Sequence, residues 1–223
     1  MPQALLDQTL GNIVSQYPDA TRVFDAYRLD FCCGGQQVLR DALKAQTREE
    51  TESLLSDLSS LRPSGNPDVT DWREVSTDAL IDHITERFHD RHRDDLPELI
   101  RLAQRIENVH GEHPQCPRGL ADALSEFLRE LETHMMKEER ILFPMLRRMD
   151  ADRVQAPIAM MRFEHDRHGE ELAQITQLTH DLREPEDACG SWRALYAGLR
   201  QFRHDLMEHI HLENNILFVS QHA

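Results

Sequence analysis

The sequence predicts an all-α protein, with a small N-terminal helical domain followed by an up-down-up-down four-helix bundle. Long spans contain few Gly, Pro or β-branched residues and many Leu, Ala, Glu and Arg residues, which favour helices. No segment keeps a two-residue alternation of apolar and polar side chains for long. Four long helical patterns are joined by short loops, which favours antiparallel neighbours in a bundle.

The N-terminal part contains several short helical patterns. They are TLGNIVSQYP, DATRVFDAYRL, and the stretches at about 36–46 and 49–61, interrupted by the turn-like segment DFCCGG. The segment RPSGNPDVTDW is rich in Pro, Gly, Ser, Asn and Asp, which is typical of a linker. We therefore expect a helical Cys-Cys domain over 1–61, a linker over 62–76 and the bundle over 77–223.

The bundle helices are expected at about 77–109, 117–148, 157–183 and 191–218. Thr77 is a suitable N-cap for the first of them. Pro97 lies inside that helix, where the ring should kink the helix or shift its register.

Charge and hydropathy exclude several classes of function. The formal net charge is −15, whereas a nucleic-acid-binding protein normally carries a basic face, so we expect no nucleic-acid partner. No apolar run approaches the ~20 residues that span a bilayer, so we expect no membrane partner. The N-terminus lacks a basic region followed by an apolar one, so no secretory signal is indicated and a cytoplasmic location is expected.

The predicted bundle contains an internal repeat. HDRHRDDLPEL begins at His89 and HDRHGEELAQI begins at His165, 76 residues later. HMMKEERILFP begins at His134 and HIHLENNILFV begins at His209, 75 residues later. Each half therefore supplies one histidine from its first helix and a His-x-x-x-Glu pair from its second.

Helix geometry brings these side chains to one place. At a rise of ~1.5 Å per residue, the four histidines fall at a similar level of an antiparallel bundle. A histidine and a glutamate four residues apart share one helix face. The six candidate metal ligands are His89, His134, Glu138, His165, His209 and Glu213.

Six such donors suit two metal ions. Each ion would take two imidazole nitrogens and one oxygen from each of Glu138 and Glu213, with room for a bridging oxo or hydroxo group. Imidazole and carboxylate donors favour iron, manganese or zinc, and bundles with inward Glu and His side chains are typical of di-iron proteins. A lone buried histidine is more often a hydrogen-bonded core residue, but the duplicated set favours metal. The spacing therefore predicts a pair of metal ions with two bridging carboxylates, and two non-haem iron ions are one such pair.

Other polar residues of the repeat are candidates for a surrounding shell. Glu130 lies one turn before a proposed ligand and Glu164 lies next to one, so both are candidates for an outer shell or a polar access route. His92 and His168 each follow a proposed ligand by three residues, and could be outer-shell partners or surface residues.

Cys32 and Cys33 are adjacent, which allows only a strained vicinal disulfide, so thiols are expected in a reducing compartment. Gly34 and Gly35 follow and allow unusual backbone angles or the close approach of a partner. One interpretation is an inert pair at a turn. The alternatives are a redox or NO-accepting pair, or a transient iron ligand during delivery.

Five segments together resemble a known family. In chain order they are LDFCCGG, FHDRHR, HMMKEERILFP, EHD and HIHLENNILF. They resemble the iron–sulfur cluster repair proteins of the repair-of-iron-centres family, YtfE type. The resemblance implies an N-terminal domain bearing the Cys-Cys pair and a hemerythrin-like four-helix domain with a di-iron centre. The six ligands predicted from the repeat match that centre. Val219 departs from the family pattern, which has Pro there.

The resemblance also implies a function. The family is linked to restoring iron–sulfur enzymes damaged by nitric oxide or peroxide, and to handling nitric oxide at the di-iron site. The expected partners are damaged iron–sulfur proteins and, as small ligands, NO or O2; a homodimer is left open. Two alternatives remain: a sensor or store for oxygen, NO or iron, and an NO or peroxide reductase with real turnover.

Overall fold

The computed structural model describes residues 2–63, 70–148 and 151–219 of the 223-residue chain. The predicted all-α class is confirmed. Within these ranges no β-strand occurs, and the one extended pairing is an isolated bridge between Thr9 and Val38. No helix in the described part of the chain combines the length and apolarity that crossing a membrane requires.

The chain divides into two compact units. One comprises residues 1–81 together with 207–223, and the other comprises residues 82–206. The boundary near the C-terminus falls inside a continuous helix, α11, Gly190–Leu212. The division at 1–61, 62–76 and 77–223 stays a prediction, and residues 64–69 of the expected linker lie outside the described residues.

Short helices build the N-terminal part of the first unit. They are α1 (Pro2–Leu6), α2 (Leu10–Gln16), α3 (Ala20–Ala26), α4 (Leu39–Ala42), a 3-10 turn η1 (Leu43–Ala45) and α5 (Arg48–Ser59). Thr9 caps α2 by accepting a hydrogen bond from the Asn12 amide, and Thr47 forms a capping box with Glu50 at the start of α5. Their apolar faces meet in a core that includes Ile13, Phe24, Leu39 and Leu54.

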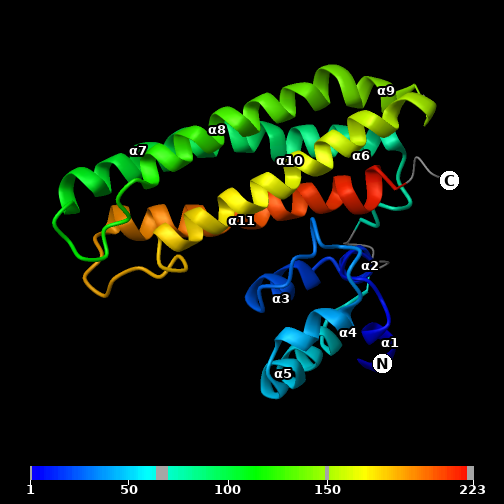
Figure 1. The fold of residues 1–223 in the computed structure, drawn as a ribbon, viewed down its shortest axis with the longest axis horizontal. Helices are drawn as coiled ribbons and strands as arrows, with labels where there is room; N and C mark the ends of the chain where they lie inside the picture. The colour runs from blue at the N-terminus through cyan, green and yellow to red at the C-terminus, as the bar shows by residue number, and fades with distance from the viewer. Residues whose placement is uncertain (1, 64–69, 149–150, 220–223) are drawn as a thin grey trace. The chain divides into compact units, whose positions relative to one another are not determined.

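Long helices form the second unit, residues 82–206. The elements from residue 77 onward are α6 (Thr77–Ile84), η2 (Thr85–His89), α7 (Asp90–His110), α8 (Leu120–Lys137), η3 (Glu138–Leu142), α9 (Phe143–Arg147), α10 (Ala151–Leu178), α11 and η4 (Glu213–Leu217). The start of α6, the end of α11 and the turn η4 are counted in the first unit. Helices α7, α8, α10 and α11 lie side by side (Figure 1). The Phe202 ring of α11 packs against His92 of α7 and Phe127 of α8, at centroid distances of 5.3 and 5.6 Å. The predicted helical bundle is therefore observed.

Pro97 and Pro157 both lie inside helices. Pro97 lies within α7, and the irregular turn of that helical run comes earlier, at η2. The third bundle helix begins at Ala151 and ends at Leu178, so its predicted bounds of 157–183 were wrong at both ends. One apolar stripe continues on both sides of Pro157, through the buried side chains of Val154, Ile158 and Met161. This stripe explains why the helix begins before the proline.

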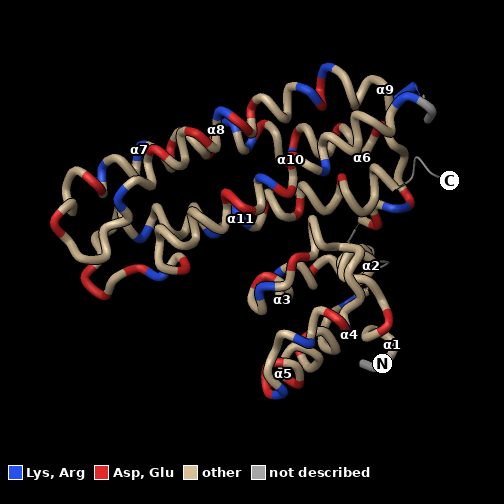
Figure 2. Tube along the Cα trace, viewed as in Figure 1, with Lys and Arg blue, Asp and Glu red and all other residues tan. Residues whose placement is uncertain are grey.

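Charged residues of both signs are distributed along the bundle helices (Figure 2), and those on the solvent-facing sides are exposed. Several are paired along one helix at a spacing of three residues, such as Glu98 with Arg101 on α7 and Glu126 with Arg129 on α8. Such exposed pairs contribute little to stability. The charge therefore keeps these faces solvated while the opposite faces build the core.

Candidate metal centre

All six predicted ligands are fully buried. His89 ends η2, His134 lies in α8, and His165 and His209 lie in α10 and α11. Glu138 and Glu213 are the first residues of η3 and η4. Their exposed fractions are between 0 and 1%. Ionisable side chains are rarely buried so completely unless they are paired or bind a metal.

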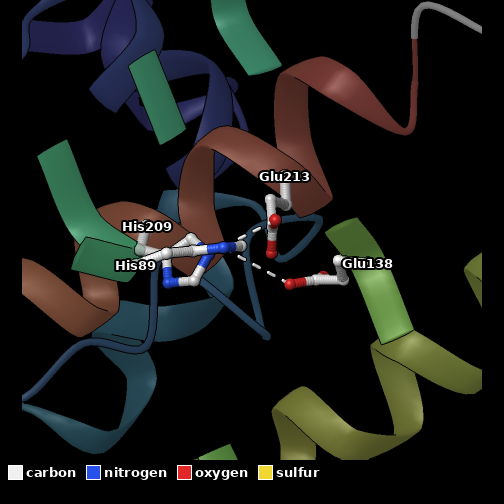
Figure 3. A group of neighbouring side chains, drawn as sticks. All are labelled: His89, Glu138, His209 and Glu213. Carbon is white, nitrogen blue, oxygen red and sulfur yellow. Dashed lines mark ion pairs between the residues drawn. The ribbon is translucent and has the colours of Figure 1, made fainter. Parts of the chain in front are cut away.

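The six donors form two groups that share the two glutamates. One group is His89, Glu138, His209 and Glu213, and the other is His134, Glu138, His165 and Glu213. Within each group, one candidate donor atom per residue lies within 4.8 Å of all the others. In the first group the two imidazoles point toward the two carboxylates (Figure 3). The structure thus brings together every ligand that the repeat predicted.

The two carboxylate oxygens of Glu138 face different histidines. Oε2 lies 3.5 Å from Nε2 of His89. Oε1 lies 3.3 Å from Nε2 of His134 and 3.9 Å from Nε2 of His165. One oxygen is thus directed to each donor group, which is the arrangement that a bridging carboxylate needs.

Carboxylates outside the two groups orient two of the imidazoles. Nδ1 of His89 lies 2.8 Å from Oε1 of Glu139, and Nδ1 of His134 lies 2.9 Å from Oε2 of Glu164. A carboxylate on Nδ1 favours the tautomer that carries its proton there. Nε2 then presents a lone pair toward Glu138, as in metal-binding histidines.

The residues present fit metal ions. Neither oxygen of Glu138 accepts a hydrogen bond from any described residue, although the carboxylate is fully buried. The nitrogens that approach those oxygens are Nε2 atoms, and Nε2 of His134 also lies 3.1 Å from Nε2 of His165. With the proton of His89 and of His134 on Nδ1, their Nε2 lone pairs face the lone pairs of the Glu138 oxygens and repel them; cations between them would turn that repulsion into coordination.

The outer carboxylates are held ionised. The hydrogen bond with His134, helped by Lys137 2.5 Å away, lowers the pKa of Glu164 to about 2 against the effect of burial. The hydrogen bond with His89, together with that from Arg93, lowers the pKa of Glu139. Each carboxylate therefore accepts from its imidazole and from a neighbouring basic side chain.

Every π-helical turn in the described residues carries a proposed ligand. η2 ends at His89, η3 begins at Glu138 and η4 begins at Glu213. A π turn makes i→i+5 hydrogen bonds and is frequent at functional sites. These turns were not foreseen, because the sequence signals helix through each of them.

The Leu-Phe segments that follow the glutamates are buried, as expected of core packing. Leu142 and Phe143 in the first half, and Leu217 and Phe218 in the second, are between 0 and 3% exposed. The ring of Phe143 stacks on His89, with centroids 5.7 Å apart and an interplanar angle of 20°. This apolar packing excludes water beside the imidazole.

The two predicted outer-shell glutamates lie at one surface cavity. Its volume is about 180 Å³, and its lining includes Glu130, Lys137 and Glu164. Glu164 contacts His134 rather than its sequence neighbour His165, whereas Glu130 pairs with Arg167 at 2.5 Å. Sequence reasoning missed Glu139, whose position next to a proposed ligand was the available signal.

His92 and His168 are buried but belong to neither donor group. The His92 ring packs on Phe88 and Phe202, with centroids 6.3 and 5.3 Å apart. The His168 ring lies 5.6 Å from Phe127 and 4.9 Å from His134. His92 therefore packs among core aromatics, and His168 lies beside a proposed ligand.

Cys32 and Cys33 are free thiols, one buried and one half-buried. A third donor, Asp30, lies with them, and sequence reasoning had not singled it out. Gly34 and Gly35 do not adopt positive φ. They are needed for close approach instead, because a Cβ on Gly35 would lie 2.4 Å from the side chain of Asn215 and 2.7 Å from the Phe31 carbonyl oxygen.

Comparison with known proteins gives two family matches and a set of close relatives. Residues 80–219 match the hemerythrin HHE cation binding domain, and residues 6–62 match ScdA_N, described as a domain of unknown function. A hemerythrin domain implies iron binding, and the two donor groups could hold metal ions.

Among curated relatives, proteins named iron–sulfur cluster repair protein YtfE are similar over nearly the whole chain. The protein from Yersinia pseudotuberculosis serotype IB (strain PB1/+) is 47% identical over 212 residues, covering 95% of each chain. The protein from Pectobacterium carotovorum subsp. carotovorum (strain PC1) is 48% identical over 217 residues, covering 96% of each. The protein from Dickeya chrysanthemi (strain Ech1591) is 49% identical over 217 residues, covering 95% of each.

Proposed function

Because this chain belongs to the family of YtfE-type iron–sulfur cluster repair proteins and carries a hemerythrin HHE domain, we propose that it repairs iron–sulfur clusters damaged by nitrosative or oxidative stress. Its partners would be damaged iron–sulfur proteins, with NO or O2 as small ligands, and its location would be the cytoplasm. The observation that carries the proposal is the pair of buried donor groups joined by two shared glutamates.

The centre proposed is a pair of iron ions. His89 and His209 would hold one ion, and His134 and His165 the other. Glu138 and Glu213 would bridge them, which the separate directions of the two Glu138 oxygens support. Bound iron would supply redox chemistry and open coordination positions for a small ligand such as NO or O2.

The chain's own residues would prepare that centre. Glu139 and Glu164 hold the imidazoles of His89 and His134 with Nε2 directed inward. Phe143 covers one imidazole and keeps bulk water away from it. The cavity lined by Glu130 and Glu164 would provide a polar access route. Iron donation to a cluster and removal of NO are both consistent with these roles.

The Cys pair would take part in exchange of iron or NO with the client. Cys33 is the more accessible of the two thiols, while Cys32 is 6% exposed. Truncation would be a poor test of this role, because Phe31 and Cys32 accept hydrogen bonds from Asn215, two residues from Glu213. Single Cys→Ser variants leave that packing in place and are the better choice.

The proposal is tested by reactivation of an iron–sulfur enzyme whose cluster has been nitrosylated. Glu138→Leu removes one bridging carboxylate and should abolish both reactivation and binding of roughly two irons per chain. Glu112→Leu, in an exposed loop, is the matched control and should behave as the unaltered protein. Equal reactivation by Glu138→Leu would show that the di-iron centre is not required for repair of the client enzyme.

The same assay separates the alternatives. A sensor or store would bind its ligand at the centre yet fail to reactivate the client at any protein concentration. A reductase would consume NO or peroxide over many turnovers when a defined electron donor is added. Repair predicts client recovery in proportion to the iron-loaded protein supplied.

A further inference from the structure

The loop that follows α3 holds together three side chains of the types that can bind a metal. Asp30, Cys32 and Cys33 each offer one donor atom, and these atoms lie within 4.8 Å of one another. The loop lies outside the bundle helices and shares no residue with either histidine group. Cys32 is buried, Cys33 is half-buried and Asp30 is exposed, so one side of the group is open to solvent.

The distances suit one tetrahedral ion. The two Sγ atoms are 3.9 Å apart. With metal–sulfur bonds of ~2.3 Å, that separation corresponds to an S–metal–S angle of about 115°. Oδ1 of Asp30 lies 3.3 Å from Sγ of Cys32, which corresponds to an O–metal–S angle of about 100° for a metal–oxygen bond of ~2.1 Å. Both angles lie near the tetrahedral value.

The loop is already held in the shape that the ion would need. Oδ1 of Asp30 accepts hydrogen bonds from the backbone amides of Cys32 and Cys33, at 3.2 and 3.0 Å. On the other side, Nδ2 of Asn215 donates to the carbonyl oxygens of Phe31 and Cys32, both at 3.2 Å. Little ordering of the backbone would therefore be required on binding.

The surroundings of Cys32 destabilise a thiolate that has no cation beside it, and so favour the binding of a cation. The side chain of Cys32 is 6% exposed and lies beside the carboxylate of Asp30. Its Sγ lies within hydrogen-bond distance of Oδ1 of Asp30, at 3.3 Å, and of Sγ of Cys33, at 3.9 Å, so the thiol proton lies among the three donors. A metal ion in that place would stabilise the thiolate directly.

We propose that Asp30, Cys32 and Cys33 form a second metal site, which binds one thiophilic divalent cation of the Zn²⁺ or Fe²⁺ class. Binding would release the two thiol protons, giving a ligand set of charge −3 and a complex of charge −1. Three protein donors leave a fourth tetrahedral position open, as in exchangeable rather than closed structural sites. The proposal deepens the role that the proposed function gives the Cys pair, but its evidence and its test do not depend on the bundle centre.

Cobalt(II) is the probe for this site. It is added to the reduced, full-length protein whose bundle centre has already been loaded with iron. Thiolate coordination gives a near-ultraviolet sulfur-to-cobalt charge-transfer band, which histidine and carboxylate donors cannot produce. We expect the band to saturate at one Co²⁺ per chain and Zn²⁺ to displace it.

Variants identify the donors. Cys32→Ser and Cys33→Ser should each weaken or abolish the band. Asp30→Asn keeps an oxygen that accepts the two amide hydrogen bonds but removes the charge, so Co²⁺ affinity should fall at least tenfold. Cys116→Ser and Cys189→Ser are the matched controls and should leave the band unchanged. Circular dichroism and bundle iron content confirm that each variant is folded.

Three results of the cobalt titration would overturn the proposal. They are the absence of the band with four titratable thiols present, an unchanged band in both Cys32→Ser and Cys33→Ser, and unchanged affinity in Asp30→Asn. A vicinal disulfide that persists under reductant, detected as two missing thiols, would also exclude the site. Because repair is measured separately on Glu138→Leu, failure here leaves that proposal standing.

Discussion

The carboxylates that surround the imidazoles come from different elements. Glu139 lies in η3 and reaches His89, whereas Glu164 lies in α10 and reaches His134. In each case the partner comes from a helix other than the histidine's own. Such hydrogen bonds to the outer nitrogen fix which nitrogen is available to a metal and raise its basicity.

Removing an outer carboxylate should weaken metal binding without removing a ligand. We expect Glu164→Ala and Glu139→Ala each to lower iron affinity by about 10- to 100-fold, because His134 or His89 loses its orienting acceptor. The measurement is competition with a chelator of known affinity. Glu186→Ala, at an exposed position, is the control. Affinities within twofold of the unaltered protein would contradict the orienting role.

The π turn η4 serves two groups of residues at once. Its first residue, Glu213, belongs to both donor groups, and the next two, Asn214 and Asn215, donate to the carbonyl oxygen of Cys32. η3 begins at the equivalent position of the first half, so the repeat extends to these two π turns. η2 has no equivalent in α10, which is α-helical throughout.

Asn215→Ala should loosen the loop that carries Cys32 and Cys33. It removes one amide donor from the carbonyl oxygen of Phe31 and one from that of Cys32, which keeps the hydrogen bond from Asn214. We expect Cys33 to be alkylated about tenfold faster, which corresponds to ~1.4 kcal/mol of easier local opening. Asn108→Ala, on the exposed face of α7, should leave the rate unchanged. An unaltered Cys33 rate in Asn215→Ala would mean that other contacts hold the loop.

A cluster of carboxylates on α8 and α10 should make stability depend on pH. Burial, together with Glu130, raises the pKa of Glu171 from 4.5 to about 7. The folded state therefore holds the proton more tightly than the unfolded state does. The stability that this proton provides is complete below about pH 4.5 and is lost as the pH rises to about 7.

Glu171→Gln should remove that dependence, because the amide is neutral at every pH. Relative to the unaltered protein, the variant should gain about 1–2 kcal/mol in free energy of unfolding between pH 5 and pH 8, allowing for partial exposure. Urea unfolding at the two pH values measures the difference. A difference between the two proteins that stays constant with pH would contradict the raised pKa.

The candidate ligands are buried, and they come from helices of both halves of the repeat. α7, α8, α10 and α11 each bring one histidine or follow directly from one, and the two glutamates join the groups. Collecting fully buried carboxylates and imidazoles costs free energy unless cations compensate their charge. The stability of the whole fold should therefore depend on metal.

Iron removal by chelation should lower the midpoint of thermal unfolding. Binding at 100 times the dissociation constant contributes ~2.7 kcal/mol, which for a chain of this size corresponds to about 5–10 °C. Calorimetry of the iron-loaded and chelated protein at equal concentration measures the shift, and restored iron should reverse it. An unchanged midpoint, with iron loss verified, would count against metal at the buried donors.

The all-α class and the grouping of the six candidate ligands could be predicted from the chain alone. Helical periodicity places His134 and Glu138 on one face, and the 75-residue repeat places His209 and Glu213 in the same way. The repeat gives a second copy of the pattern. A single histidine without that copy would not have been distinguishable from an ordinary core residue.

Contacts between distant segments could not be predicted. Only the tertiary structure pairs Glu164 with His134 rather than with its neighbour His165, and it places Asp30 with the two thiols. It also brings Asn215 to Phe31, 184 positions away along the chain. Local spacing determines which face of a helix a side chain occupies, because helix geometry is regular. The partner that the side chain meets there depends on the packing of other elements, which short-range spacing does not encode.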